Sequence, residues 1–90
     1  MDNTFDVLII TPEVSIRRKA VSLSVPAESG YMCALARHAP ILENLVPGRI
    51  TLRSGVPSVA QHWESGGKGF FKFRDNTATV ILDSFKPEQF

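Results

Sequence analysis

Apolar and polar residues alternate along most of this 90-residue chain. Val21, Leu23 and Val25 alternate with serines, and the same period of two recurs in the stretch 49–53, while the stretch 5–10 is a run rich in branched apolar residues. This period is typical of strands that bury one face. Further strands are expected at 13–19, 32–35, 59–63, 70–73 and 77–82. About seven or eight short strands, with turn signals at intervals of roughly ten residues, favour an all-β sandwich or barrel. No amphipathic helix and no internal repeat is evident.

Turn-forming residues separate these stretches. Thr11-Pro12 closes the first strand, and Asp75-Asn76 precedes the last long one. A third turn is expected at 54–57. Asp6 places a charge on one face of the first strand, and this indicates an exposed edge of the sheet.

The stretch from Val25 to Leu45 has the densest set of backbone constraints. Pro26 cannot donate to a ladder and Gly30 allows a positive φ, so the chain should leave a strand at Val25 and reverse by Tyr31. Pro40 pushes the residue before it into an extended conformation, which places His38 at the end of a stiff, non-helical segment. A connection this long and this constrained predicts a functional loop region.

Composition narrows the class of protein. Ninety residues with 43% hydrophobic and 21% charged residues make one domain over residues 1–90, with a single core. A net charge of +1 argues against nucleic acid as the principal partner. The single cysteine excludes an internal disulfide framework and fits a reducing compartment. No apolar run reaches the length of a membrane span, and the acidic start MDNTFD is unlike a signal peptide.

The candidate chemical groups are sparse. Cys33 and His38 could form a thiol and base pair, but nothing in the sequence supplies contact or a third orienting group. We expect Cys33, between Met32 and Ala34, to be a small buried hydrophobic residue. One cysteine and two histidines do not make a zinc site, so neither a metal nor a cofactor is expected.

The glycine-rich stretch 65–69, SGGKG, also lacks the signature of a phosphate site. It does not have the spacing of a phosphate-binding loop, and no helix pattern follows it. The glycines there predict a bulge or the close approach of another backbone. Of the nearby aromatic residues, Phe70, Phe71 and Phe73, we expect alternate rings in the core and at least one on the other face.

The segment PAESGYMCALARHAPILENLVPGRITL resembles the N-terminal domain of epsilon subunits of F-type ATP synthases. The shared pattern is a glycine, a Met or Leu, a Leu-type residue, His-Ala-Pro, an apolar run and Pro-Gly. It extends upstream through Thr11-Pro12-Glu13 and downstream to the TVILD segment ending at Asp83. The likeness covers nearly the whole chain.

This resemblance implies a sandwich of about ten strands that belongs to the central stalk and has no active site of its own. Such a subunit binds the gamma subunit and the c-ring, and supports the coupling of proton translocation to ATP synthesis. It binds no nucleic acid. The partner-binding residues implied here are Tyr31, Arg37, His38 and Glu43, with Tyr31 toward the c-ring and His38 toward gamma. The location implied is peripheral to the membrane, on the cytoplasmic side in a bacterium or the matrix side in a mitochondrion.

The chain also departs from the family pattern. Family members commonly have Leu-Pro-Gly before His-Ala-Pro, whereas this chain has Leu35, Ala36 and Arg37. The position after Gly30, often acidic in the family, is Tyr31. The C-terminal helical hairpin of bacterial relatives is absent from this sequence, so inhibition of rotation and ATP binding through it are not expected. The alternative reading is a free-standing β-sandwich that has diverged from the subunit and binds another protein.

Overall fold

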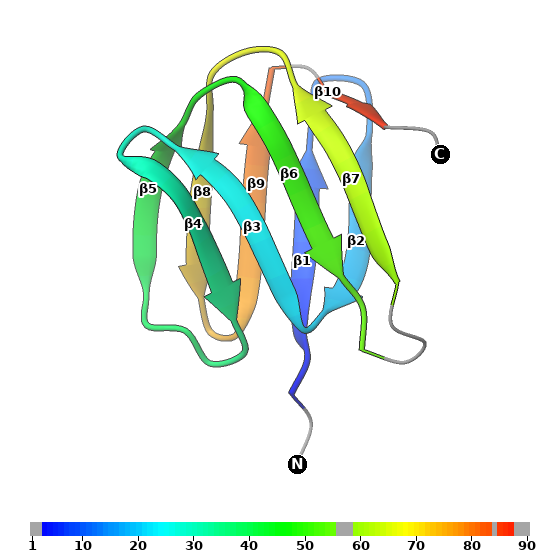
Figure 1. Cartoon of the computed structure of the whole chain (residues 1–90), viewed down its shortest axis with the longest axis vertical. Coiled ribbons are helices and arrows are strands. Elements are labelled where there is room, and N and C mark those ends of the chain that lie inside the picture. Colours follow the sequence, from blue (N-terminus) through cyan, green and yellow to red (C-terminus); the bar gives the residue numbers. More distant parts are fainter. Residues whose placement is uncertain (1–2, 56–58, 84, 88–90) are drawn as a thin grey trace.

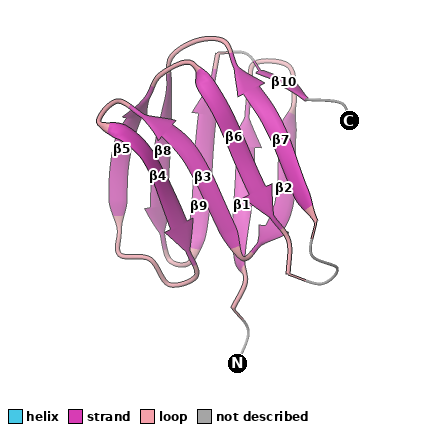
Figure 2. Ribbon diagram, in the orientation of Figure 1, coloured by secondary structure: helices cyan, strands magenta, loops and turns pink. Residues whose placement is uncertain are grey.

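The computed structural model describes residues 3–55, 59–83 and 85–87, and within them every regular element is a strand (Figures 1 and 2). The prediction of an all-β fold is confirmed. Ten strands follow one another along the chain: β1 Phe5–Ile10, β2 Ser15–Ala20, β3 Ser22–Ala27, β4 Gly30–Leu35, β5 Ile41–Leu45, β6 Gly48–Arg53, β7 Ala60–Ser65, β8 Gly69–Arg74, β9 Thr77–Leu82 and β10 Phe85–Pro87.

The strands form one sheet that folds over into two layers. Its order is β10-β7-β6-β3-β5-β8-β9-β1-β2, with β4 paired to the other side of β3. In Figure 1 strands β4, β3, β6 and β7 lie in front of β5, β8, β9, β1 and β2. The layers join where Ala27 of β3 pairs with Leu45 of β5. Strands β1 and β9 are parallel, and the other pairs are antiparallel.

Strand β1 is not an edge, so the expectation drawn from Asp6 is wrong. The strand is flanked by β2 and β9. Asp6 stands opposite Lys19 of β2, and its carboxylate lies 3.2 Å from the lysine amine. The charge on the outer face of the strand is therefore matched by a neighbour, and it does not mark the end of the sheet.

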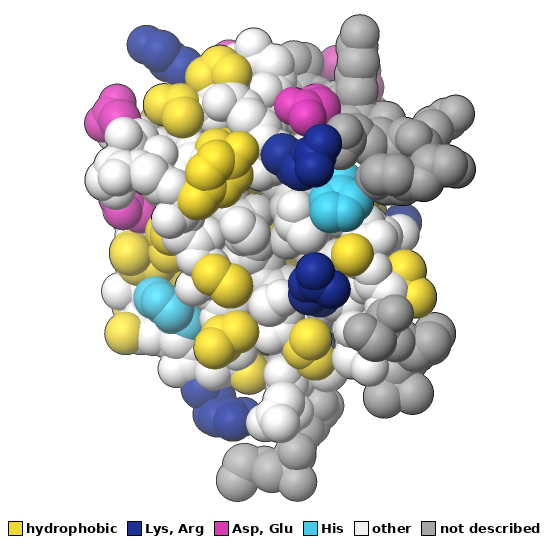
Figure 3. Space-filling view, in the orientation of Figure 1, with side chains coloured by type: hydrophobic (Ala, Val, Ile, Leu, Met, Phe, Trp, Pro, Cys, Tyr) yellow, Lys and Arg dark blue, Asp and Glu magenta, His cyan; other side chains and the backbone are white. Residues whose placement is uncertain are grey.

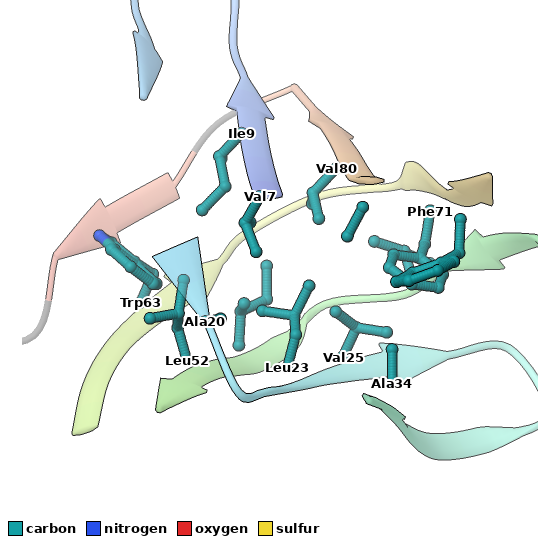
Figure 4. Close-up of a cluster of buried hydrophobic side chains, with 14 of the residues drawn as sticks. Val7, Ile9, Ala20, Leu23, Val25, Ala34, Leu52, Trp63, Phe71 and Val80 are labelled. Atoms are coloured by element: carbon teal, nitrogen blue, oxygen red, sulfur yellow. The ribbon is translucent and has the colours of Figure 1, made fainter. Parts of the chain in front are cut away.

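The core lies between the two layers and is made of alternate residues from the facing strands (Figure 4). Leu23 and Val25 of β3, Val7 of β1 and Val80 of β9 are fully buried. Phe71 and Phe73 are also fully buried, while Phe70 is 51% exposed, as the spacing of the three rings predicts. Each Å² of apolar surface buried in this core contributes about 25 cal/mol to the stability of the closed sandwich.

Because successive antiparallel strands reverse direction, the connections gather at two ends of the sandwich. The turn end holds the connections 28–29, 46–47 and 66–68, and the loop end holds 36–40 and 75–76. The two ends appear at the top and bottom of Figure 1, respectively. Asp75 and Asn76 have φ of 53° and 56°, the positive values of a type I′ turn, so the turn predicted there is confirmed. The turn expected at 54–57 includes residues outside the described part.

Candidate partner-binding surfaces

Tyr31 stands at the turn end, as the first residue after Gly30 on β4, and is 63% exposed. Its hydroxyl accepts a hydrogen bond of 2.9 Å from the main-chain N–H of Arg49. The hydroxyl also lies over Gly48, since a Cβ added there would be 2.9 Å from it and 2.8 Å from Cβ of Pro26. The tyrosine ring is therefore held across the sheet in one place while most of its surface faces solvent.

Arg37 and His38 lie together at the opposite end, in the loop between β4 and β5. The Arg37 N–H donates to Oδ1 of Asn76 at 2.7 Å, and the His38 N–H donates to the carbonyl of Leu35 at 3.1 Å. The His38 ring packs edge-on against Phe73, with ring centroids 5.6 Å apart, and its Nδ1 is 2.7 Å from the carbonyl oxygen of Ala39. The loop is thus fastened to the β8–β9 turn and to the core.

Arg37 has φ of 62°, in the left-handed region that favours glycine. This accounts physically for the glycine that family members have before His-Ala-Pro. Arg37→Gly should therefore raise the free energy of unfolding by about 0.5–1 kcal/mol, since relief of left-handed strain exceeds the added entropy of the unfolded chain. The control is Ala39→Gly, an exposed loop position without a positive φ, which should be destabilising. Urea unfolding checks both variants, and equal losses of stability would contradict the assignment.

Glu43 is separate from the other predicted partner-binding residues. It lies in the middle of β5, half-buried, opposite Phe71 of β8. The structure therefore brings together Arg37 and His38, places Tyr31 at the other end, and leaves Glu43 on a strand between them.

The sequence interpretation missed an apolar band on the outer face of the second layer. Phe70 of β8 and Ile81 of β9 are directly opposite one another and are 51% and 46% exposed. Ile10 of β1 continues the row beside Ile81, and Leu42 of β5, 68% exposed, lies on the same face. We call Phe70, Ile81, Ile10 and Leu42 the outer band. The adjacent phenylalanines 70 and 71 were its signal, because two neighbouring apolar residues in a strand must face opposite sides.

A cleft of about 430 Å³ opens at the turn end beside the outer band. Phe70, Ile81 and Val46 give it apolar walls, and Glu28, Lys68 and Asp83 bring charges to it. The cleft extends the surface of the band toward the turn end.

Cys33 is exposed, so the expectation that it is buried is wrong. It lies on the outer face of β4, between Met32 and Ala34, which point inward. A period of two in the strand, and not the apolar character of its neighbours, decides its side. No three His, Cys, Asp or Glu side chains gather at a point where a metal could bind, within the residues described.

The glycine-rich segment forms the turn between β7 and β8, with the Ser65 hydroxyl donating to the carbonyl of Gly67 at 3.2 Å. A Cβ added to Gly69 would fall on the carbonyl oxygen of Ile81. The prediction of a close backbone approach is therefore confirmed. No helix long and apolar enough to cross a membrane occurs in the described ranges.

The fold and its surfaces define a β-sandwich domain with an exposed apolar band on one face and an exposed tyrosine at one end. Residues 4–88 match the ATP synthase, Delta/Epsilon chain, beta-sandwich domain, and the chain belongs to this family. The ATP synthase epsilon chain of Magnetococcus marinus is 31% identical over 84 residues, which are 92% of this chain and 59% of the relative. That of Koribacter versatilis is 29% identical over an alignment of 93 residues, covering 99% and 62%. The chain thus spans about three-fifths of the length of these relatives.

Two solved structures have the same fold. A chain in the Euglena gracilis mitochondrial ATP synthase OSCP/F1/c-ring structure superposes with a TM-score of 0.86 at 14% identity, covering 97% of this chain and 55% of that one. A chain in the central stalk/c-ring structure of Tetrahymena thermophila mitochondrial ATP synthase gives a TM-score of 0.74 at 17% identity, covering 90% and 64%.

Proposed function

We propose that this chain is a non-catalytic central-stalk subunit of an F-type ATP synthase that links the gamma subunit to the c-ring. In this role it supports the coupling of proton translocation to ATP synthesis and binds no nucleotide. The observation that carries the proposal is the position of the exposed surfaces on one sandwich with a single core. The outer band lies on the outer face of the second layer, and Tyr31 stands at the turn end of the sandwich.

The outer band suits the gamma subunit. Exposed large apolar residues that are neighbours across strands are typical of the centre of a protein interface. Leu42, which is paired with Lys72 of β8, extends this face toward the loop end, where Pro40 lies beside it and His38 packs on Phe73 beneath. Gamma would therefore contact the band and the Arg37-His38 loop together, as the sequence predicted for His38.

The turn end suits the ring. Tyr31 provides a large, rigid contact area whose orientation is fixed by its bond to Arg49. With Tyr31 toward the c-ring and His38 toward gamma, the two contacts lie at opposite ends of the molecule. A sandwich closed by a continuous core can transmit torque between them without bending. The chain would then be peripheral to the membrane through the complex, on the cytoplasmic or the matrix side.

Binding of the purified chain to the gamma subunit tests this assignment. Phe70→Asp should weaken binding by about 2 kcal/mol, roughly 30-fold, because it places a charge at the centre of an apolar contact. Val59→Asp is the matched control, since Val59 is 46% exposed but lies just before β7 in the first layer, outside both the outer band and the Arg37-His38 loop. If the Phe70→Asp variant keeps its fold by circular dichroism and binds gamma with unchanged affinity, gamma does not bind the outer band. It would favour the alternative of a free-standing binding module.

A further inference from the structure

We propose that strand β4 is also a self-association edge, at which β4 of a second copy pairs antiparallel about a two-fold axis through Cys33. Strand β4 pairs only with β3 in the part of the chain that the structure describes. Its other side is the free edge of the first layer (Figure 1). An unpaired strand edge is a template for pairing with another chain.

The hydrogen-bonding groups of this edge follow from the register. The Pro26 carbonyl accepts the Val46 N–H, so the main-chain groups of Pro26 point away from β4. In an antiparallel ladder such residues alternate with those that bond across the pair. Val25 therefore bonds with Met32, and Ala27 with Gly30. The main-chain groups of Tyr31 and Cys33 therefore point outward to the free edge, where a further strand could bond to them. The Leu35 N–H points the same way, while the Leu35 carbonyl already accepts the His38 N–H.

The side chains of the same residues leave this edge unprotected. Tyr31 is 63% exposed, Leu35 is 57% exposed, and Cys33 is exposed as well. Strand β4 contains no charged residue and no proline, which are the usual devices that prevent edge pairing. Apolar side chains gather over the middle of the β4 side of the face in Figure 3, while basic ones lie at its upper and lower ends and over β6 and β7.

The edge is self-complementary. A two-fold axis at Cys33 pairs Tyr31 with Leu35 of the second copy, and Cys33 with its own equivalent. It also brings the β3–β4 turn, which carries Glu28, toward the Arg37-His38 loop that follows β4 in the second copy. An acidic turn at one end of each strand thus meets a basic loop at the other end. A net charge of only +1 adds little repulsion between copies.

The pairing would be weak and reversible. Six-residue strands bury far less than the roughly 1,600 Å² of a standard stable interface. Since Tyr31 belongs both to this edge and to the proposed ring contact, a paired chain could not assemble through Tyr31. Self-pairing would therefore hold unassembled chains apart from the complex. The proposal of self-pairing rests on the geometry of the β4 edge and does not depend on the identity of the partner proteins.

Disulfide trapping tests the register. Equivalent residues in such a ladder have Cα atoms about 5.5 Å apart, within the range of a disulfide. Diamide accepts the two thiol hydrogens as the sulfur–sulfur bond forms, and is itself reduced. The Cys33 dimer should form at least about tenfold faster than one formed through Leu42→Cys in a Cys33→Ser chain, since pairing raises the effective thiol concentration. Leu42 is the control because it is 68% exposed and lies on β5 in the second layer, outside strand β4.

Light scattering over a range of concentrations provides the second measurement. The wild-type mass should rise toward that of a dimer, and added salt should lower it because Glu28 faces a basic loop. Cys33→Pro should stay monomeric with its fold intact, because it removes only an outward N–H. Leu35→Lys should do the same by placing a charge on the edge. A monomer at all concentrations, or equal trapping rates for Cys33 and the Leu42→Cys control, would overturn the proposal.

Discussion

Replacing Phe73 by alanine should lower the free energy of unfolding by about 4 kcal/mol, the largest effect expected of a single core substitution here. Phe73 is fully buried on β8. Its ring packs edge-on against Phe5 at 5.4 Å and against His38 at 5.6 Å between centroids. The change removes the contact that joins the first strand, the β8 strand and the His38 loop, and leaves a cavity that a closed sandwich fills poorly.

Differential scanning calorimetry checks this expectation. A loss of this size should lower the Tm by roughly 16–32 °C for a domain of this length. Phe70→Ala is the control, because the same side chain is removed from an exposed position on the same strand, and its effect should stay within about 1 kcal/mol. Equal losses for the two variants would show that the rings do not differ in burial.

Gly69→Ala should cost about 3 kcal/mol, although it adds a single methyl group. The new Cβ would meet the carbonyl oxygen of Ile81 and would lie 2.9 Å from Cδ2 of Leu82. The oxygen belongs to the backbone of the neighbouring strand, so the β8–β9 pair must separate to admit the methyl group.

Gly67→Ala is the matched control in the same turn. Its Cβ would lie 3.5 Å from Cβ of Asp83, an ordinary van der Waals contact. Equilibrium urea unfolding should therefore show a small change for Gly67→Ala and a large one for Gly69→Ala. A loss below about 1 kcal/mol for Gly69→Ala would contradict the close approach of the two strands.

Much of the sheet could be predicted from the sequence, because apolar and polar residues alternate along a strand that buries one face. Strands β3, β6 and β9 follow that pattern closely. Strand β5 was not predicted because Leu42 faces solvent while Ile41 and Leu45 pack inward, so its apolar residues do not alternate.

The candidate site was only partly predictable for a related reason. The bend at Arg37 is stabilised by Asn76, 39 positions away in sequence, and no local pattern reports such a bond. The outer band likewise depends on Phe70 and Ile81 becoming neighbours across two strands. The reversal at Gly30 could be predicted, since glycine there has φ of 126° and the turn is local.

The most direct test of the proposed role is co-purification from native membranes with a tagged chain. The gamma subunit and the c-ring should be recovered with the wild-type chain in comparable amounts, and much less of gamma should be recovered with Phe70→Asp. Recovery of the wild-type chain from the same membranes without gamma or the c-ring would contradict its assignment to the central stalk.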